Sequence, residues 1–287
     1  MRITSLLSST LLLLAGASGS VSATTSGNKN HGNNKDGTTS PQFGASSLLV
    51  NTGQPVGKEF VHKNITFYIS KPDPVSPRTR ARAGDAVLFL TDVFGLALPQ
   101  NKLLIDSFAR AGYLTLGPDL FQGAPAPADI NVPGFNTSAF LAAHSPSVTD
   151  PIVATAIEYL RDTLKVSRIG VTGYCFGGRY AFRFAAPGKG TNAAFTAHPS
   201  LVEDQEILGI GEPLAVAAAD NDSLLNATAR ASMEALLGRT GQRYQVNLYG
   251  GTPHGFAVRA NLSVPSEKYG KEESFVQAVR WFDTFLV

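Results

Sequence analysis

The chain has 287 residues, of which 43% are hydrophobic and 16% are charged, and its formal net charge is +2. This length suits one α/β domain with a sizeable buried core. Acidic and basic residues are interspersed without a basic stripe, so we expect no nucleic-acid partner.

The chain begins with the pattern of a secretory signal peptide. Arg2 supplies a positive start, residues 6–15 are apolar, and residues 21–23 read Val-Ser-Ala, a small-x-small cleavage site. The apolar run is too short to span a bilayer, and no later run is long and apolar enough to do so. We therefore expect residues 1–23 to be a signal peptide and the mature protein to be secreted, without a membrane anchor.

A polar segment follows the signal peptide. Residues 24–48 are rich in Thr, Ser, Gly, Asn and Lys, with almost no large apolar side chain before Leu48. Such a segment cannot bury enough surface to offset its ordering entropy. We expect residues 24–54 to be a disordered leader and residues 55–287 to be one domain. Five Asn-x-Ser/Thr sequons agree with secretion and are candidate glycosylation sites: Asn64, Asn136, Asn221, Asn226 and Asn261.

Short apolar runs alternate with helical patterns along the rest of the chain. The runs predict strands at residues 65–69, 86–91, 114–117, 168–172, 193–197, 214–218 and 244–249. The helical patterns predict helices at residues 98–111, 151–164, 178–186, 226–237 and 272–285. Asp150 followed by Pro151 is typical of a helix start. Continuous apolar strands alternating with helices indicate an α/β fold with a parallel sheet buried on both faces. The segment 121–149, rich in Pro and Ala, is expected to form a lid or pocket loop.

The only cysteine of the chain lies between a predicted strand and a predicted helix. Cys175 is the centre of Gly173-Tyr174-Cys175-Phe176-Gly177-Gly178. This small-x-nucleophile-x-small turn is the nucleophile elbow of α/β-hydrolases, whose sharp geometry leaves no room for side chains on the flanking residues. We interpret Cys175 as the nucleophile; the alternative is a buried structural thiol.

A base and an acid follow the nucleophile in the order this fold requires. His254 comes directly after the last predicted strand, where the base of an α/β-hydrolase lies. The acid should follow the preceding strand, which ends in Asp220-Asn221-Asp222. We prefer Asp222, because it lies past the turn, and keep Asp220 as the fallback. A carboxylate there would hold the imidazole tautomer and stabilise the imidazolium.

Two backbone N–H groups are expected to form the oxyanion hole. One belongs to Phe176, the residue after the nucleophile, and the other to Val93 in the loop after an earlier strand. A helix N-terminus and a neighbouring imidazolium both favour a thiolate at Cys175. Attack by that thiolate would form a thioester that water then hydrolyses.

These motifs make the chain similar to the dienelactone hydrolase family, the carboxymethylenebutenolidases. The similarity spans residues 55–287 and rests on residues 91–95, 111–113, 118–120, 173–178, 222 and 254–256. It implies an α/β-hydrolase fold, with a mostly parallel central sheet and helices in three layers. It also implies a Cys-Asp-His triad, no metal or cofactor, and a small-molecule enol-lactone or ester as substrate. We expect a monomer.

The chain departs from this family pattern at two places. The family has a glutamate that contacts the nucleophilic thiol and modulates its ionisation, whereas this chain has Asp92, which either keeps that role or shapes the turn. The family also binds a substrate carboxylate with arginines, and Arg259 is a candidate for one of them. His198, Phe94 and Tyr174 are candidate substrate contacts, with packing in the core as the alternative.

Three functions remain open on the sequence. The favoured one is a secreted thiol-dependent lactone or ester hydrolase. The second is a biosynthetic enzyme that uses the same acyl-thiol pocket for transfer, lactonisation or isomerisation. The third is a non-catalytic small-molecule-binding protein, for which the only indication is the Asn221 sequon beside Asp222.

Overall fold

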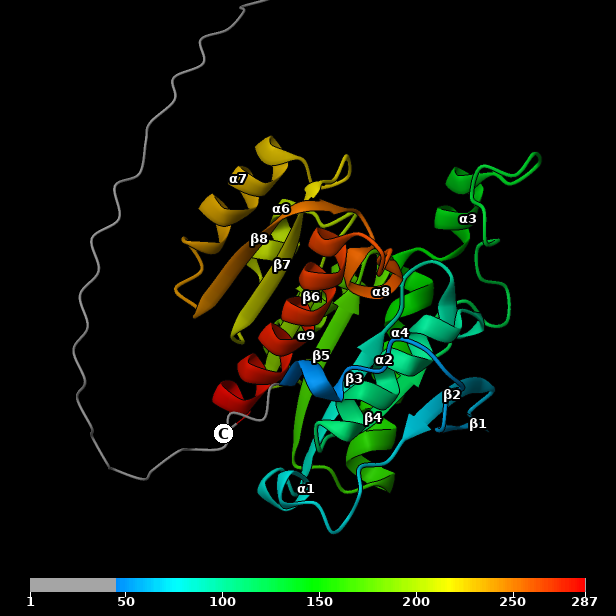
Figure 1. Cartoon of the computed structure of the whole chain (residues 1–287), viewed down its shortest axis with the longest axis vertical. Coiled ribbons are helices and arrows are strands. Elements are labelled where there is room, and N and C mark those ends of the chain that lie inside the picture. Colours follow the sequence, from blue (N-terminus) through cyan, green and yellow to red (C-terminus); the bar gives the residue numbers. More distant parts are fainter. Residues whose placement is uncertain (1–44, 287) are drawn as a thin grey trace, which may run out of the picture. The chain divides into compact units, whose positions relative to one another are not determined.

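The structure, a computed structural model, describes residues 45–286 (Figure 1). The predicted signal peptide and residues 24–44 of the predicted leader lie outside this range. Residues 45–54, which were predicted to be part of the leader, belong to the fold, so the leader is shorter than predicted. Ala45–Leu48 form a 3₁₀ turn, Leu49 is buried, and the N–H of Val50 donates to Ser107 Oγ at 2.8 Å.

The described strands form one sheet in the order β1-β2-β4-β3-β5-β6-β7-β8. Their bounds are β1 Lys58–His62, β2 Ile65–Ser70, β3 Asp85–Leu90, β4 Leu114–Pro118, β5 Arg168–Tyr174, β6 Ala193–Ala197, β7 Leu214–Asn221 and β8 Tyr244–Pro253. Strand β2 pairs antiparallel with β1 and β4, and the other pairs are parallel. The structure confirms all seven predicted strands. Strand β1 was not predicted, since its sequence KEFVH is short and rich in charge.

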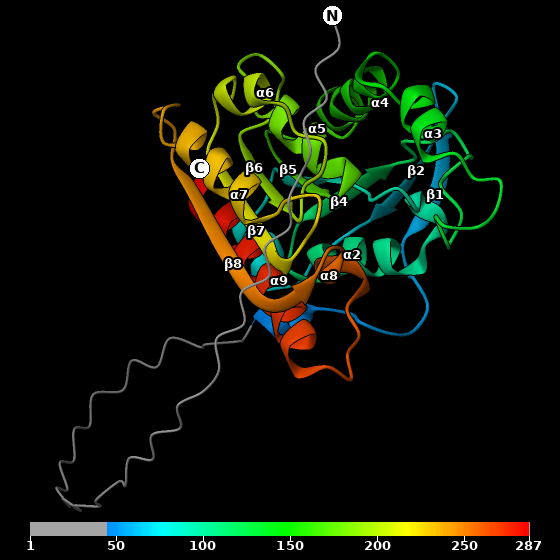
Figure 2. The same cartoon turned by 90° about the horizontal axis from the view of Figure 1, so that it is seen from above.

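Helices cover both faces of the sheet. They are α1 Pro77–Ala81, α2 Pro99–Arg110, α3 Thr137–Ala143, α4 Pro146–Glu158, α5 Phe176–Phe184, α6 Asp204–Leu208, α7 Ala227–Leu237, α8 Phe256–Arg259 and α9 Pro265–Phe285. A 3₁₀ turn spans Gly95–Ala97 and a π-helical turn spans Tyr159–Thr163. Figure 2 shows α4, α5 and α6 on one side of the sheet and α2 and α9 on the other. This arrangement confirms the expected three-layer α/β fold.

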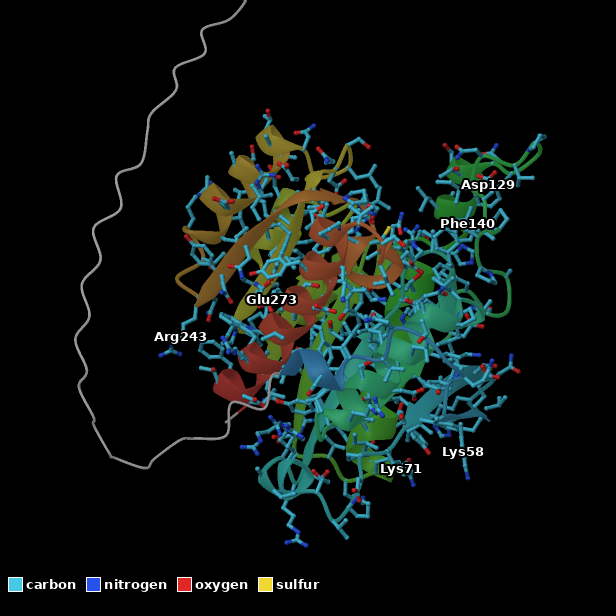
Figure 3. All side chains as sticks on the ribbon, viewed as in Figure 1. Lys58, Lys71, Asp129, Phe140, Arg243 and Glu273 are labelled. Carbon is cyan, nitrogen blue, oxygen red and sulfur yellow. The ribbon has the colours of Figure 1, made fainter. Side chains whose placement is uncertain are left out.

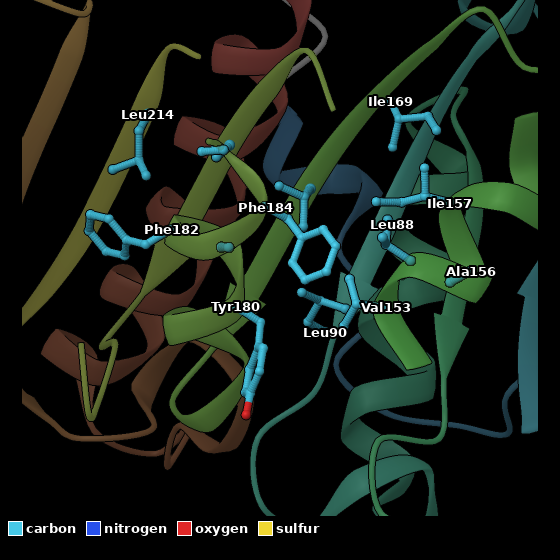
Figure 4. Close-up of a cluster of buried hydrophobic side chains, with 14 of the residues drawn as sticks. Leu88, Leu90, Val153, Ala156, Ile157, Ile169, Tyr180, Phe182, Phe184 and Leu214 are labelled. Atoms are coloured by element: carbon cyan, nitrogen blue, oxygen red, sulfur yellow. The ribbon is translucent and has the colours of Figure 1, made fainter. Parts of the chain in front are cut away.

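The core lies on both faces of the sheet because successive strand residues point in opposite directions. In β3, Leu88 and Leu90 pack with helices α4 and α5, whereas Val87 and Phe89 pack with α2 and α9. Figure 4 shows Leu88 and Leu90 against Val153 of α4 and beside the α5 residues. Burial on both faces explains why the central strands read as continuous apolar runs.

Two predicted helix starts are wrong. Helix α4 begins at Pro146, after Ser145, and Pro151 lies inside it. Asp150 does not cap the helix, because its carboxylate pairs with Arg183 of α5. Helix α9 begins at Pro265 rather than residue 272.

The earlier start of α9 includes Gly270, which hides the helical pattern. A Cβ on Gly270 would lie 2.7 Å from Thr252 Cγ2, so close packing against the strand end requires glycine there. Within residues 45–286, no helix is long and apolar enough to cross a membrane.

Candidate active site

The turn between β5 and α5 holds Cys175 in a strained conformation. Cys175 has φ 52° and ψ −112°, a region that side chains rarely occupy, and its side chain is buried. A Cβ on Gly173 would lie 2.1 Å from the carbonyl oxygen of Gly177, and one on Gly177 would lie 2.3 Å from that of Leu90. The flanking glycines are therefore required by contact with the backbone, as the motif predicts.

His254 and Asp222 meet at the carboxyl ends of β8 and β7. His254 Nδ1 lies 2.8 Å from Asp222 Oδ2, and the carboxylate also accepts the N–H groups of Leu224 and Leu225 on its other oxygen. Asp220, the fallback acid, instead accepts the N–H of Gly251 at 3.3 Å and is exposed. The structure thus brings the preferred acid to the histidine, and not the fallback.

The second ring nitrogen of His254, Nε2, is buried and has no hydrogen-bonding partner within residues 45–286. Burial lowers the pKa of His254, but the hydrogen bond to Asp222 and the neighbouring Cys175 thiol raise it more, to about 9. Burial raises the pKa of Asp222, but the hydrogen bond to His254 and the two backbone N–H groups lower it further than burial raises it. Asp222 and His254 therefore favour each other's charged form.

A serine that the sequence did not reveal also contacts the thiol. Cys175 Sγ lies 3.7 Å from Ser200 Oγ, in the turn after β6. The residues around Ser200 carry no motif, and only the pairing of β5 with β6 brings this turn beside the elbow. The one available signal was that parallel strands end at the same edge of the sheet.

A cavity of about 410 Å³ opens above Cys175. Residues 126–141 line much of it, as predicted for the Pro- and Ala-rich segment, but the segment is not a loop throughout, since it contains α3 and the start of α4. Val93 and Phe176, the predicted oxyanion-hole residues, both line the cavity beside Cys175, as do Phe94 and Arg259. Arg259 lies 4.7 Å from the centre of the Phe94 ring, a cation–π distance.

Asp92, for which the sequence left a thiol-modulating and a turn-shaping role open, binds Arg259, Asn101 and the backbone of its own turn. Its Oδ1 accepts from Asn101 Nδ2 at 2.9 Å and from the N–H of Phe94 at 3.2 Å, and its Oδ2 accepts from Arg259 Nε at 3.1 Å. Burial raises the pKa of Asp92, against the lowering by Asn101 and Arg259. The carboxylate shapes its turn and holds Arg259, because these donors occupy both of its oxygens.

Two of the candidate substrate contacts lie beneath the cavity instead of along it. Tyr174 is 1% exposed and stacks on Phe89, with ring centres 4.8 Å apart. His198 is fully buried, and its ring meets those of His254 and Phe256 at 5.0 and 5.5 Å. Burial and the nearby His254 lower the pKa of His198 well below its ordinary value, so this imidazole is neutral. Both residues support the site from the core.

Asn101 on α2 is the other residue of the site that the sequence did not reveal. Its Nδ2 bridges Asp92 Oδ1 and the carbonyl oxygen of Gly95, both at 2.9 Å. Only its complete burial inside a helix sets it apart, and burial is not visible in a sequence. No cluster of three or more His, Cys, Asp or Glu side chains that could hold a metal ion occurs in the described part of the chain.

Comparisons with known proteins agree with this geometry. The model of the dienelactone hydrolase family matches residues 74–286. Hydrolase pyvD of Aspergillus violaceofuscus is 39% identical over 83% of this chain and 94% of its own length, and Hydrolase tropI of Talaromyces stipitatus is 36% identical over 82% and 92%. The crystal structure of a putative dienelactone hydrolase from Klebsiella pneumoniae shares the fold, with a TM-score of 0.64, 17% identity, and coverage of 80% of this chain and 99% of that one.

Proposed function

Because this chain belongs to the dienelactone hydrolase family and is a hydrolase acting on ester or lactone bonds, we propose that it works through Cys175, His254 and Asp222. Family membership sets aside the non-catalytic alternative. The observation that carries the proposal is the His254–Asp222 hydrogen bond of 2.8 Å, which leaves His254 Nε2 without a partner among the described residues while His254 lines the same cavity as Cys175.

The proposed reaction has two halves. The Cys175 thiolate attacks the carbonyl carbon, and the N–H groups of Val93 and Phe176 stabilise the negative oxygen. The carbon–oxygen bond of the ester then breaks, and the His254 imidazolium gives its proton to the leaving oxygen, which leaves a thioester on Cys175. Water attacks the thioester with His254 as base, and the carboxylic acid leaves while the thiolate–imidazolium pair is restored.

Arg259 supplies the positive charge for a polar group on the substrate. It lines the cavity, its Nε is bound to Asp92, and its guanidinium lies over Phe94. This leaves its terminal nitrogens for a carboxylate or carbonyl oxygen of the substrate.

Hydrolysis of short p-nitrophenyl esters and enol-lactones by wild type and Cys175→Ala tests the proposal. We expect loss of turnover in the variant and an acyl adduct on the single cysteine of wild type, measured by intact-protein mass spectrometry after quenching. Equal rates in the two proteins would show that Cys175 is not the nucleophile. Product analysis with an added alcohol distinguishes hydrolysis from the biosynthetic alternative, acyl transfer.

We also propose that the protein is secreted and glycosylated. The sequence of residues 1–23 supports secretion, and the asparagines of all five sequons are exposed. At Asn221 the side chain is exposed while that of Asp222 is buried, so a glycan at Asn221 is compatible with the acid. Mass spectrometry of protein from a eukaryotic host should find an N-terminus at Thr24 and glycans removable by an amidase. An intact Met1 would contradict secretion.

A further inference from the structure

The cavity above Cys175 is largely apolar. Its walls include three aromatic side chains from the segment before α4 and from the elbow, Phe135, Phe140 and Phe176, together with Leu141. The polar residues of the wall are fewer, and they are Asp129, Asn131, Thr137, Ser200, His254 and Arg259.

Helix α3 forms one wall without burying any of its own residues. Phe140 and Leu141 point to the cavity and are only half-buried. Figure 3 shows Phe140 and Asp129 on the α3 segment, which projects from the sheet and its covering helices. Phe140 also contacts Phe121 and Phe135, with ring centres 5.4 and 5.6 Å apart, and the remaining exposed surface of Phe140 and Leu141 can be buried by an apolar group in the cavity.

The mouth of the cavity exposes three further large apolar side chains from three separate loops. Ile130 is 42% exposed, Leu201 is 45% exposed and Leu224 is 57% exposed, and all three line the cavity. Leu201 also has φ +61°, a conformation that is unfavourable for a bulky side chain. Strain that holds an apolar side chain at a cavity mouth indicates a function for it.

We infer that the substrate carries a bulky apolar group, an aromatic ring system or a long acyl chain, which packs against α3 and reaches across Ile130, Leu201 and Leu224. This inference rests on the proposed function, because it concerns the substrate of the same Cys175 site. An apolar occupant covers the exposed rim and the still accessible parts of Phe140 and Leu141 together.

A series of p-nitrophenyl esters from acetate to decanoate tests the substrate class. We expect kcat/KM to rise with acyl length, by up to about 4-fold per methylene that is buried. Leu201→Asn and Ile130→Asn should flatten this rise. Val61→Asn is the matched control, because Val61 is 67% exposed on β1 and does not line the cavity.

Two outcomes separate this inference from the proposed function. A preference for the acetate ester, with turnover still abolished by Cys175→Ala, would overturn the apolar substrate and leave the nucleophile in place. Turnover that survives Cys175→Ala would overturn the proposed function itself.

A separate observation concerns the thiol. The turn after β6 is bound to the elbow on both sides: the N–H of Cys175 donates to the carbonyl oxygen of Ala197, and the N–H of Ser200 donates to that of Cys175. These bonds, at 3.2 and 3.1 Å, fix Ser200 Oγ at 3.7 Å from Cys175 Sγ. Asp92 is bound to Arg259 and Asn101, whereas Ser200 has a hydrogen-bonding contact with the sulfur, which His254 also neighbours.

We propose that the Ser200 hydroxyl donates a hydrogen bond to the Cys175 thiolate and keeps the sulfur aimed at the cavity. The hydroxyl proton stays on Ser200 throughout. A donor to an anion stabilises it more than a donor to a neutral thiol, so Ser200 favours the reactive form.

The pH dependence of alkylation by iodoacetamide tests this role, because the chain has only one cysteine to label. We expect Ser200→Ala to slow alkylation at neutral pH by about 10-fold or more and to move the midpoint of the profile to higher pH. Ser200→Thr keeps the hydroxyl and should restore both. Thr137→Ala, which removes a hydroxyl elsewhere on the cavity wall, is the control.

The pH midpoint of the alkylation profile distinguishes a hydrogen bond from Ser200 to the thiolate from a purely structural role of Ser200. An Ala variant with native circular dichroism and an unchanged profile would overturn the proposal. Ser200→Gly, which also lacks the hydroxyl, gives the same comparison through a second variant.

Discussion

At the scale of single residues, the site depends on which partner each charged group meets. The sequence offers two candidate acids for His254 after the preceding strand, and only Asp222 reaches it, because Asp220 accepts from the N–H of Gly251. Asp92 meets Arg259. If Asp220 met His254 in place of Asp222, or if Asp92 had another partner, the same residue types would support a different mechanism.

Asp222→Asn should lower the pKa of His254 from about 9, because burial lowers it and the carboxylate opposes that effect. Without the carboxylate, the His254 imidazole is also no longer held in the tautomer that can act as base. The kcat of ester hydrolysis should therefore fall by up to about 10⁴-fold. Titration of the histidine ring protons by NMR and ester hydrolysis check the two effects. Asp220→Asn is the control, and an unchanged His254 titration in Asp222→Asn would contradict the assignment.

Arg259→Ala should destabilise the protein by about 1–3 kcal/mol, because the Asp92 carboxylate, whose side chain is fully buried, would lose its cation. The double variant Asp92→Asn/Arg259→Ala should recover part of this loss. Urea unfolding of wild type, both single variants and the double variant gives the coupling free energy. Additive losses would show that the two side chains do not support each other.

At the scale of elements, the elbow depends on the close approach of α5 to β3 and β6. The glycines of the turn permit this approach, and the pairing of β5 with β6 brings the Ser200 turn to the sulfur. The site is thus assembled from the ends of neighbouring parallel strands.

Gly177→Ala should push α5 away from β3, since the new Cβ would lie 2.3 Å from the carbonyl oxygen of Leu90. We expect a destabilisation of about 1–3 kcal/mol and a larger loss of activity, as the helix carries Phe176 and follows Cys175. Thermal unfolding and ester hydrolysis measure both. Gly250→Ala, where a Cβ has open space, is the control, and equal effects at both positions would argue against the clash.

At the scale of the whole described fold, the buried ionisable groups couple stability to pH. His254 is raised from 6.5 to about 9 on folding, so it contributes stability that is fully present below pH 6.5. Burial lowers the pKa of Lys271 to about 8, which acts in the opposite direction. The two effects have to be separated by a variant.

The difference in free energy of unfolding between wild type and His254→Gln should therefore shrink as pH rises from 6 through 9. Urea unfolding of both proteins across this range measures the difference, and Lys271 contributes equally to each. A difference that grows with pH would contradict a raised pKa for His254.

The sequence by itself determined the seven predicted strands and the α/β class, because apolar runs in strands buried on both faces are visible along the chain. It also determined the elbow, since backbone contact at Gly173 and Gly177 permits no side chain. The helix start predicted at Pro151 was wrong because Asp150 pairs with Arg183 of another helix instead of capping its own. A contact between two helices is not visible along the chain. Only the tertiary structure decided that Asp222 meets His254, that Asp92 meets Arg259 and that Ser200 meets Cys175. The physical reason is that these pairs join residues far apart in the chain, and their distances depend on how strands and helices pack.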